Sequence, residues 1–552
     1  MDKLKMQTAN LIDKNIEQIV NLFPNVLTEK KDDAGNIKKA IDFDLLKQSL
    51  SDVLVDDENE RYCLDWPGKK ASLLKANTPI KETLRPCREE SVDFDNTENV
   101  YIDGDNFEVL KILQESYLGK IKMIYIDPPY NTGNDFIYSD NYVINKEEYE
   151  DELGVENEEG EKLFKNTDSN GRFHSDWLSM MYERLIVARD LLKDDGVIFI
   201  SIDDGEASNV RKLCDEIFAE VNFVADIIWQ KKFARSNDAT YFSTMHDHIF
   251  CYVKNTKLNG NGKGWDLKLL PRGNELPDGY SNPDNDPRGK WTSVVLSAKS
   301  GTNKLIYEII TPNGRSCLPP DGRYWSVNKE KFTQLVADSR IWFGKKGDGV
   351  PRLKTFLSEV QDGLRPNTIW FHQEVGHNQE GRQEVKKLFD DKGYFDSPKP
   401  VRLLSQIIKI ANTEDNDLIL DFFSGSATTA HAVMQLNAED CGNRKFIMVQ
   451  LAEKTDENSE AYKAGYKTIA EIGKERIRRA GKRIVEELKE KNKQLKLGEE
   501  SLDTSKLDTG FRVYKTADTN MKEVFYHPNE LKQDQLSFFE SNIKRSEERR
   551  VG

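Results

Sequence analysis

The sequence predicts an α/β fold with a doubly wound, mostly parallel sheet, an inserted domain and extra N- and C-terminal segments. Short apolar runs, such as 121–126 and 418–420, alternate with longer stretches of helical periodicity. Strands buried on both faces are continuously apolar, and strands that alternate with helices form parallel sheets covered on both sides. The alternation stops between residues 235 and 390, where Gly, Pro, Asn and Asp become frequent. This interruption predicts the inserted domain.

The first α/β half is predicted within residues 96–234. Apolar runs place strands at 100–102, 121–126 and 197–202, and helical periodicity places helices at 107–118 and 177–192. A long acidic insertion separates the second strand from the second helix.

The second α/β half is predicted within residues 391–480. Strands are expected at 417–423 and 446–451, and a charged helical run follows at 461–496. With the flanking segments, the predicted units are 1–95, 96–234, 235–390, 391–480 and 481–552. The first of these carries helical patterns around 12–22 and 43–55 and no catalytic constellation.

Bulk properties favour a soluble cytoplasmic protein. The 552 residues have a net charge of −15, no apolar run reaches membrane-spanning length, and the six cysteines contain no C-x-x-C pair. The first residues lack the apolar core of a signal peptide. Local patches decide nucleic-acid binding more than net charge does. Basic clusters at 231–235, 345–346 and 474–483 therefore suggest an acidic body with a basic cleft, although taken alone the last cluster is typical of a solvated helix face.

A first chemical motif follows the strand at 121–126. Asp127-Pro128-Pro129-Tyr130 places a carboxylate and rigid carbonyls at the end of a buried strand. Two neighbouring acceptors suit an exocyclic NH₂ group, and the tyrosine ring offers a face on which a base could stack. The alternative is a proline-rich turn after a core strand.

A second motif follows the strand at 418–420. Asp421-Phe422-Phe423-Ser424-Gly425-Ser426-Ala427-Thr428-Thr429 precedes a helical stretch, so strand, small-residue turn and helix succeed one another. This order lets backbone approach a nucleotide-like ligand at a helix N-terminus. The spacing is neither the G-x-G-x-x-G dinucleotide fingerprint nor a P-loop.

Together the two motifs resemble the catalytic and S-adenosylmethionine motifs of amino-methylating DNA methyltransferases. Their order, with the catalytic motif first, resembles the permuted β group. Further segments are similar to the modification subunits of type III restriction–modification systems, and the resemblance spans about residues 40 to 530. These segments are Asp103–Asn106, Asn131–Asn134, Phe173–Leu185, Asp195–Asp204 and Ser397–Val401.

The resemblance implies a Rossmann-like fold, S-adenosylmethionine as cofactor, and adenine N6 in double-stranded DNA as the target. It makes residues 235–390 a target-recognition domain, and it implies a homodimer that works with a restriction subunit. The expected catalytic residues are Asp127, Pro128, Pro129 and Tyr130, with stacking assigned to the ring of Tyr130. The expected cofactor-binding residues are Asp105, Lys399, Asp421, Phe423, Ser424, Gly425, Ser426, Thr428 and Glu453.

Three positions depart from the family pattern or stay ambiguous. Gln450 stands where many relatives have the acid that holds the cofactor ribose, so Glu453 is favoured for that role. Ala427 replaces a common glycine. The possible reverse translations of Arg545–Gly552 include a frame of a sequencing-library adapter, so we expect that the gene was cut off and a C-terminal domain lost; the alternative is a genuine basic–acidic tail.

Two other functions compete with adenine methylation. Cytosine-N4 methylation needs the same acceptor geometry, although serine is then more common in place of Asp127. A recognition and scaffold subunit without turnover would result if Ala427 or the lost C-terminus disabled the enzyme. No metal site is predicted: His246 and His248 lie on one strand face without an evident third ligand, and Asp203-Asp204 is interpreted as a strand-end turn.

Overall fold

The computed structural model describes residues 64–132, 173–235, 240–256, 264–271, 279–359, 363–494 and 507–519, with short pieces elsewhere. Among those pieces are the paired strands β1 (Leu27–Lys31) and β2 (Ile37–Ile41), and β6 (Phe136–Tyr138) and β7 (Leu163–Lys165). Most of the two predicted N-terminal helical patterns, most of the acidic insertion and the eight C-terminal residues lie outside the described residues.

The largest sheet in the described part of the chain has ten strands. Six consecutive strands in the middle, from β8 to β21, are parallel to one another, whereas β10 and β3 run antiparallel to their neighbours. The predicted mostly parallel sheet is thus confirmed. In spatial order the strands are β18 (Ile369–Trp370), β9 (Phe223–Gln230), β10 (His246–Val253), β8 (Leu192–Ile202), β5 (Ile121–Ile126), β19 (Leu418–Asp421), β20 (Lys445–Gln450), β4 (Val100–Asp103), β21 (Arg512–Asp518) and β3 (Glu82–Pro86).

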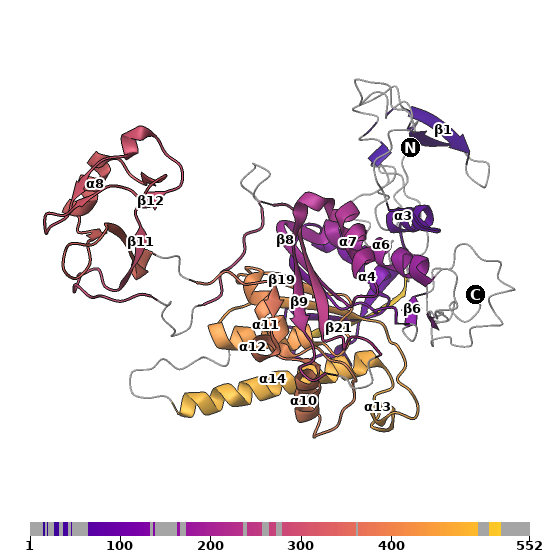
Figure 1. Ribbon diagram of the computed structural model, residues 1–552. Helices are drawn as coiled ribbons and strands as arrows, with labels where there is room; N and C mark the ends of the chain where they lie inside the picture. The colour runs from indigo at the N-terminus through magenta and orange to yellow at the C-terminus, as the bar shows by residue number, and fades with distance from the viewer. Residues whose placement is uncertain are drawn as a thin grey trace, which may run out of the picture. The chain divides into compact units, whose positions relative to one another are not determined.

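Helices cover both faces of this sheet. From β4 through β5 to β8 the chain moves in one direction across the sheet, and from β19 to β20 it moves in the other. Because parallel crossovers are right-handed, the two directions place their helices on opposite faces. Figure 1 shows α4 (Asn106–Tyr117), α6 (Phe173–Leu191) and α7 (Ala207–Cys214) on one side, and α11 (Val401–Ile410), α12 (Thr428–Asp440) and α14 (Ile469–Lys493) on the other.

The core lies between the sheet and these helices. Every residue of β5 is buried, as the apolar run predicts, and Trp177 and Leu185 of α6 pack fully buried in the same cluster as Ile124. The described residues of this unit also form the helices α3 (Lys69–Asn77), α9 (His372–Val375), α10 (Asn378–Leu388) and α13 (Glu460–Lys463). Of the helices in the described part of the chain, none combines the length and the apolar character that crossing a membrane requires.

The chain divides into two compact units, and the smaller one is narrower than the predicted insertion. It covers Leu269–Pro366, within the segment 235–390. Strand β10 and helix α10, which the prediction placed in the insertion, belong to the larger unit. Periodicity is therefore lost from about residue 235 onward, whereas the chain remains in the larger unit until residue 268.

The smaller unit is built on short strands and one helix. β11 (Trp291–Val295), β17 (Arg352–Phe356) and β16 (Ile341–Trp342) form its three-stranded sheet, and its small core gathers around the fully buried Trp325. Its remaining elements are the pairs β12 (Ser297–Ala298) with β15 (Tyr324–Trp325) and β13 (Ile309–Ile310) with β14 (Ser316–Cys317), and the helix α8 (Lys329–Ala337).

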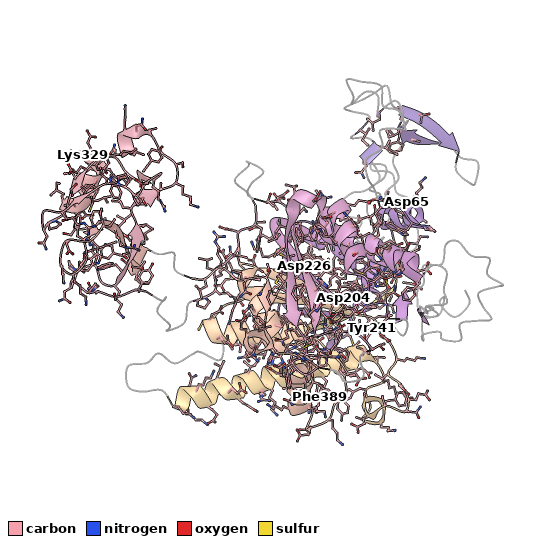
Figure 2. The ribbon with its side chains drawn as sticks, in the orientation of Figure 1. Asp65, Asp204, Asp226, Tyr241, Lys329 and Phe389 are labelled. Carbon is pink, nitrogen blue, oxygen red and sulfur yellow. The ribbon has the colours of Figure 1, made fainter. Side chains whose placement is uncertain are left out.

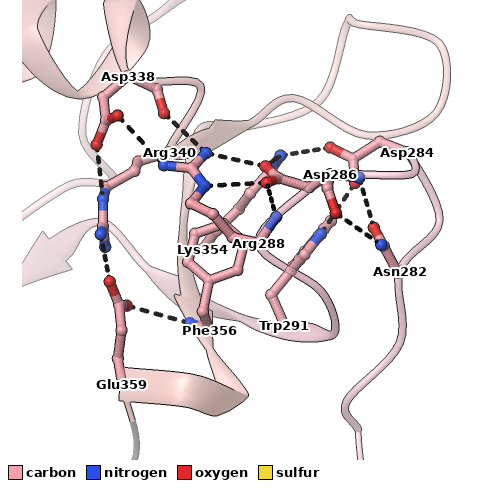
Figure 3. Close-up of polar contacts among 10 residues, drawn as sticks. All are labelled: Asn282, Asp284, Asp286, Arg288, Trp291, Asp338, Arg340, Lys354, Phe356 and Glu359. Carbon is pink, nitrogen blue, oxygen red and sulfur yellow. Dashed lines mark hydrogen bonds and ion pairs between the residues drawn. The ribbon is translucent and has the colours of Figure 1, made fainter.

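Charged side chains tie the smaller unit together beside its sheet (Figure 3). Lys354 is 3% exposed, and its ammonium lies 3.0 Å from the Asp286 carboxylate, pairs with Asp284, and lies 5.1 Å from the centroid of the Trp291 ring. Hydrogen bonds from Arg288 lower the pKa of Asp286. A buried cation is tolerated only with such partners, so the turn before β11 has one arrangement.

Candidate active site

The two sequence motifs meet at one edge of the main sheet. β5 and β19 are parallel neighbours, with Ile124 opposite Leu420. After β5 the chain continues toward β8, and after β19 it continues toward β20, on the opposite side. A crevice forms where strand order reverses in this way, outside the carboxyl ends of the strands. Asp127–Tyr130 and the turn after Asp421 both lie at that edge.

The Asp127 carboxylate is held by a lysine that sequence reasoning assigned elsewhere. Lys399 donates to Asp127 Oδ2 at 2.5 Å and to the Tyr130 hydroxyl at 3.0 Å, and its ammonium lies 5.2 Å from the centroid of the Tyr130 ring. Tyr130 in turn donates to Asp127 Oδ1 at 3.0 Å. The expected role of Lys399 in cofactor binding stays a prediction, and in the structure its ammonium contacts the catalytic motif. The Tyr130 hydroxyl, for which the sequence predicts no role, contacts both Asp127 and Lys399.

A close contact between two segments fixes the position of Lys399. A Cβ atom at Gly381 of α10 would lie 2.2 Å from the Pro398 carbonyl oxygen, so only glycine allows this approach. On the other side, Val401 N–H donates to the Glu384 carboxylate at 2.9 Å, at the start of α11. The residues on both sides of Lys399, Pro398 and Val401, are thus held against α10.

Residues on α6 and in the turn after β8 anchor the catalytic loop. The Pro129 carbonyl accepts a hydrogen bond from Trp177 Nε1 at 2.8 Å. Asn131 has a φ of 58° and donates to the Glu206 carboxylate at 2.6 Å, which also contacts His174 Nδ1 at 2.6 Å. Asparagine tolerates this left-handed backbone better than most residues. The residue type at position 131 therefore suits both the backbone conformation of the turn and its hydrogen bond to Glu206.

A second carboxylate that sequence reasoning missed lies beside Tyr130. Asp247 of β10 accepts from the Tyr130 hydroxyl at 3.4 Å and forms an ion pair with Lys231. Burial raises the pKa of Asp247, while Lys399 and Lys231 act in the opposite direction. Burial also raises the pKa of Tyr130 well above its usual range. The neutral phenol therefore contacts one ammonium group and two carboxylates, and Lys231 pairs with one of these carboxylates.

The turn after β19 is closed by its own aspartate. Asp421 accepts from the Phe423 backbone N–H at 3.1 Å and from the Thr429 hydroxyl at 2.5 Å. Its side chain is buried, and burial raises the pKa of Asp421 to about 7. Gly425, with a φ of 48°, donates to Gln450 Oε1 at 2.7 Å. Gln450, at the end of β20, therefore braces the turn.

A buried arginine of α14 holds the far side of this turn. Arg476 is fully buried and donates to the hydroxyls of Ser426 at 2.8 Å and Thr428 at 2.6 Å. Burial lowers the pKa of Arg476 to about 10. Lys474, also buried, pairs with Asp103 at 3.1 Å. The interpretation of 474–483 as a solvated helix face is wrong for these two residues.

The Asp103-Gly104-Asp105-Asn106 segment supports the site from β4. Asp105 caps α4 by accepting from Phe107 N–H at 2.7 Å, and its other oxygen lies 3.4 Å from Arg184. Asn106 donates to the Phe422 carbonyl at 2.8 Å, which ties α4 to the turn after β19. The expected role of Asp105 in cofactor binding stays a prediction.

Glu453, the expected ribose acid, lies just beyond β20, and Ala427 lies at the start of α12. Glu453 is half-buried just beyond β20, and its carbonyl accepts from Ile469 N–H at 2.9 Å; its role with the ribose stays a prediction. Ala427 is fully buried with a φ of 59° and a ψ of 42° at the start of α12. Glycine adopts this left-handed backbone without the steric cost that a Cβ atom brings.

The comparisons with known proteins agree with this geometry. The family described as DNA methylase matches residues 121–460. The Mod subunit of the type III restriction-modification enzyme StyLTI, from Salmonella typhimurium, is 37% identical over 85% of this chain and 71% of its own length. The corresponding EcoPI subunit of Escherichia phage P1 is 34% identical over 78% and 69%. The type II methyltransferase M.KpnI from Klebsiella pneumoniae is 30% identical over 68% and 86%.

The chain therefore belongs to the DNA methylases and, among them, to the modification subunits of type III restriction–modification enzymes.

We expect Ala427→Gly to change the free energy of unfolding by no more than about 1 kcal/mol. Glycine removes a left-handed strain of roughly 1–2 kcal/mol, but it loses about 0.8 kcal/mol of methyl burial and roughly 0.5–1 kcal/mol to the flexibility of the unfolded chain. Ala427→Val should be strongly destabilising because a β-branched residue resists this conformation. Thermal unfolding of both variants checks the prediction, and a stable Val variant would contradict it.

Proposed function

We propose that this chain transfers a methyl group from S-adenosylmethionine to N6 of adenine in double-stranded DNA. The observation that carries the proposal is the position of Asp127 at the carboxyl end of β5, directly beside the turn that follows β19. A carboxylate and a small-residue turn at a strand-order reversal bring an amine acceptor and a nucleotide-like ligand together. The aspartate favours adenine over cytosine, since N4 enzymes of the family more often have serine there.

The residues of the second turn fit such a cofactor. Gly425 and Ala427 turn the backbone through left-handed conformations, and the buried Asp421 lies at the head of the turn. The cofactor supplies a methyl group already activated on a sulfonium. Asp421, Phe423, Ser424, Gly425, Ser426 and Thr428 would hold its methionine part.

The catalytic loop would act on the target amine. The N6 amine is a weak nucleophile because its lone pair is conjugated with the ring. The Asp127 carboxylate and the Pro128 carbonyl would accept hydrogen bonds from its two N–H groups and so return lone-pair density to the nitrogen. The hydrogen bond from Trp177 to Pro129 keeps this turn rigid, and positioning of reacting groups is worth on the order of 7–11 kcal/mol in favourable cases.

The target adenine must leave the duplex to reach this edge. Extrusion costs a few kcal/mol, and stacking on Tyr130 would recover roughly 1–3 kcal/mol of it. Lys399 is a positioning residue in this scheme: it orients Asp127 and balances its charge. Within a type III system the chain would act as modification and specificity subunit, as a homodimer and together with a restriction subunit.

We expect Asp127→Asn to lower kcat by about 10²–10³-fold, corresponding to roughly 2.7–4 kcal/mol for a lost transition-state hydrogen bond. Affinity for S-adenosylmethionine, measured by calorimetry, should stay within a few-fold, because Asp127 is not proposed to hold the cofactor. The matched control is Asp203→Asn, which removes a carboxylate in the turn after β8 and should leave kcat unchanged.

Mass spectrometry of digested product DNA identifies the base. N6-methyladenine supports the proposal, and N4-methylcytosine would overturn its choice of target. Full activity of Asp127→Asn would overturn the catalytic role of this residue.

The raised pKa of Asp421 predicts a pH dependence of cofactor binding. Burial favours the neutral carboxyl below about pH 7, whereas the cofactor's α-ammonium favours the ionised form. Affinity for S-adenosylmethionine should therefore rise with pH through about 7 and then level off. The sign for stability is opposite: between the unfolded pKa near 4 and the folded pKa near 7, the folded state binds more protons, so stability falls as pH rises.

Calorimetric titrations between pH 5.5 and 8.5 would measure this dependence. Asp421→Asn should lower the affinity and flatten the profile, which separates the carboxyl from titration of the cofactor itself. An unchanged profile in this variant would contradict the assignment.

We propose that the segment 235–390 selects the DNA sequence, and that its compact part, residues 269–366, is the unit to exchange. Both motifs lie outside that unit, so replacing it with the matching segment of a relative should change the methylated sequence and preserve the chemistry. Base-edge contacts contribute about 1–3 kcal/mol of discrimination each. Sequencing of methylated DNA from cells reads the outcome. An active chimaera with the original specificity would place recognition elsewhere.

A further inference from the structure

Two histidines and an aspartate converge at the edge of the main sheet that carries the catalytic loop. His246 and His248 lie two residues apart at the start of β10, so their side chains share one face. Asp204 (labelled in Figure 2) lies in the turn after β8, the strand that pairs with β10. Asp204 Oδ1 is 3.5 Å from His246 Nε2 and 3.1 Å from His248 Nε2. The sequence shows the histidine pair, but only the fold brings in the third group.

The Asp226 carboxylate and the Phe250 ring fix the orientation of the His248 imidazole. Asp226 of β9 lies 3.0 Å from His248 Nδ1, and the Phe250 ring is stacked on the imidazole with centroids 5.8 Å apart and an interplanar angle of 8°. The ring is therefore oriented with Nε2 toward Asp204. Metal-binding histidines characteristically donate their second ring N–H to a carboxylate in this way, which fixes the tautomer.

We propose that Asp204, His246 and His248 bind one divalent transition-metal ion of the Zn²⁺ class. One ligand atom from each residue lies within 4.8 Å of the others. Bonds of about 2.0–2.2 Å in a tetrahedral site place ligand atoms roughly 3.3 Å apart, close to the two distances to Asp204. Two imidazoles with one carboxylate favour Zn²⁺ over Mg²⁺ or Ca²⁺.

The solvent side of the cluster supplies an entry path and a fourth position. The side chain of Asp204 is 58% exposed and that of His246 is 37% exposed, whereas His248 is 16% exposed. The ion would connect the turn after β8 to the first residues of β10. Asp247, between the two histidines, contacts Tyr130 on the other face of the strand. The ion therefore stabilises the start of β10, the strand that carries Asp247 beside the catalytic loop. It touches no reacting group.

The test uses the full-length protein purified without a histidine tag, stripped with a chelator and desalted. Titration with ZnCl₂, followed by elemental analysis after gel filtration, should give one equivalent of zinc. His246→Gln, His248→Gln and Asp204→Asn should each weaken binding at least 100-fold, and Asp226→Asn about 10–100-fold, as expected for loss of a supporting carboxylate. Asp203→Asn, next to Asp204 but outside the cluster, should bind zinc like the unmodified protein.

X-ray absorption at the zinc edge of the unmodified protein keeps the test independent of how the variants fold. Four nitrogen or oxygen ligands, two of them imidazoles, would support the site. Sulfur ligation, no stoichiometric zinc, or zinc that survives both His248→Gln and Asp204→Asn would overturn it. In the last two cases a protonated His248 between Asp204 and Asp226 accounts for the contacts.

Discussion

The parallel pairing of β5 with β19 is the constraint on which the rest of the site depends. These strands are separated by almost three hundred residues, yet Ile124 lies opposite Leu420. Their registration places Asp127 and the turn after Asp421 at the same edge, and the chain leaves that edge in two directions. The compact unit 269–366 lies between the two strands in the sequence, and it can vary as long as the pairing is kept. Chemistry and the compact insertion are thereby separated by the topology itself.

Buried charge is the second organising feature of the larger unit. Arg476 enters the core to bind the hydroxyls of Ser426 and Thr428, and Lys474 does so to pair with Asp103. Removing a charge from water is costly unless partners replace the water. In the ligand-binding turn, Nη1 of Arg476 is the donor to both hydroxyls, so the two side chains are held to one group and the turn has little freedom to relax. The same device appears in the smaller unit around Lys354.

The sequence predicted the parts of the fold and site that follow from local pattern. The strand β5 and the Asp127–Tyr130 turn were visible because a wholly apolar run ends abruptly in a carboxylate and two prolines. Resemblance alone assigns Lys399 to the cofactor, and its contact with Asp127 could not be predicted because local pattern does not show which distant motif a loop meets. Arg476 was hidden because burial of a charged residue in a charged helix depends on tertiary contacts. Asp105 carried a recognisable signal, since aspartate before a helix is a common N-cap.

The hydrogen-bond network around Tyr130 determines how strongly Asp127 can bind a substrate amine. Lys399 already occupies one oxygen of Asp127, and Tyr130 donates to the other. An amine that seeks this carboxylate has to share it with an ammonium, so the geometry of Lys399 tunes the strength of the new hydrogen bond. A cationic methyl donor nearby would be repelled by an unpaired lysine. Pairing with Asp127 removes most of that repulsion. The second pair, Lys231 with Asp247, balances the other side of the phenol in the same way. The site thus presents acceptors without a large net charge, which suits a reaction between a neutral amine and a cation.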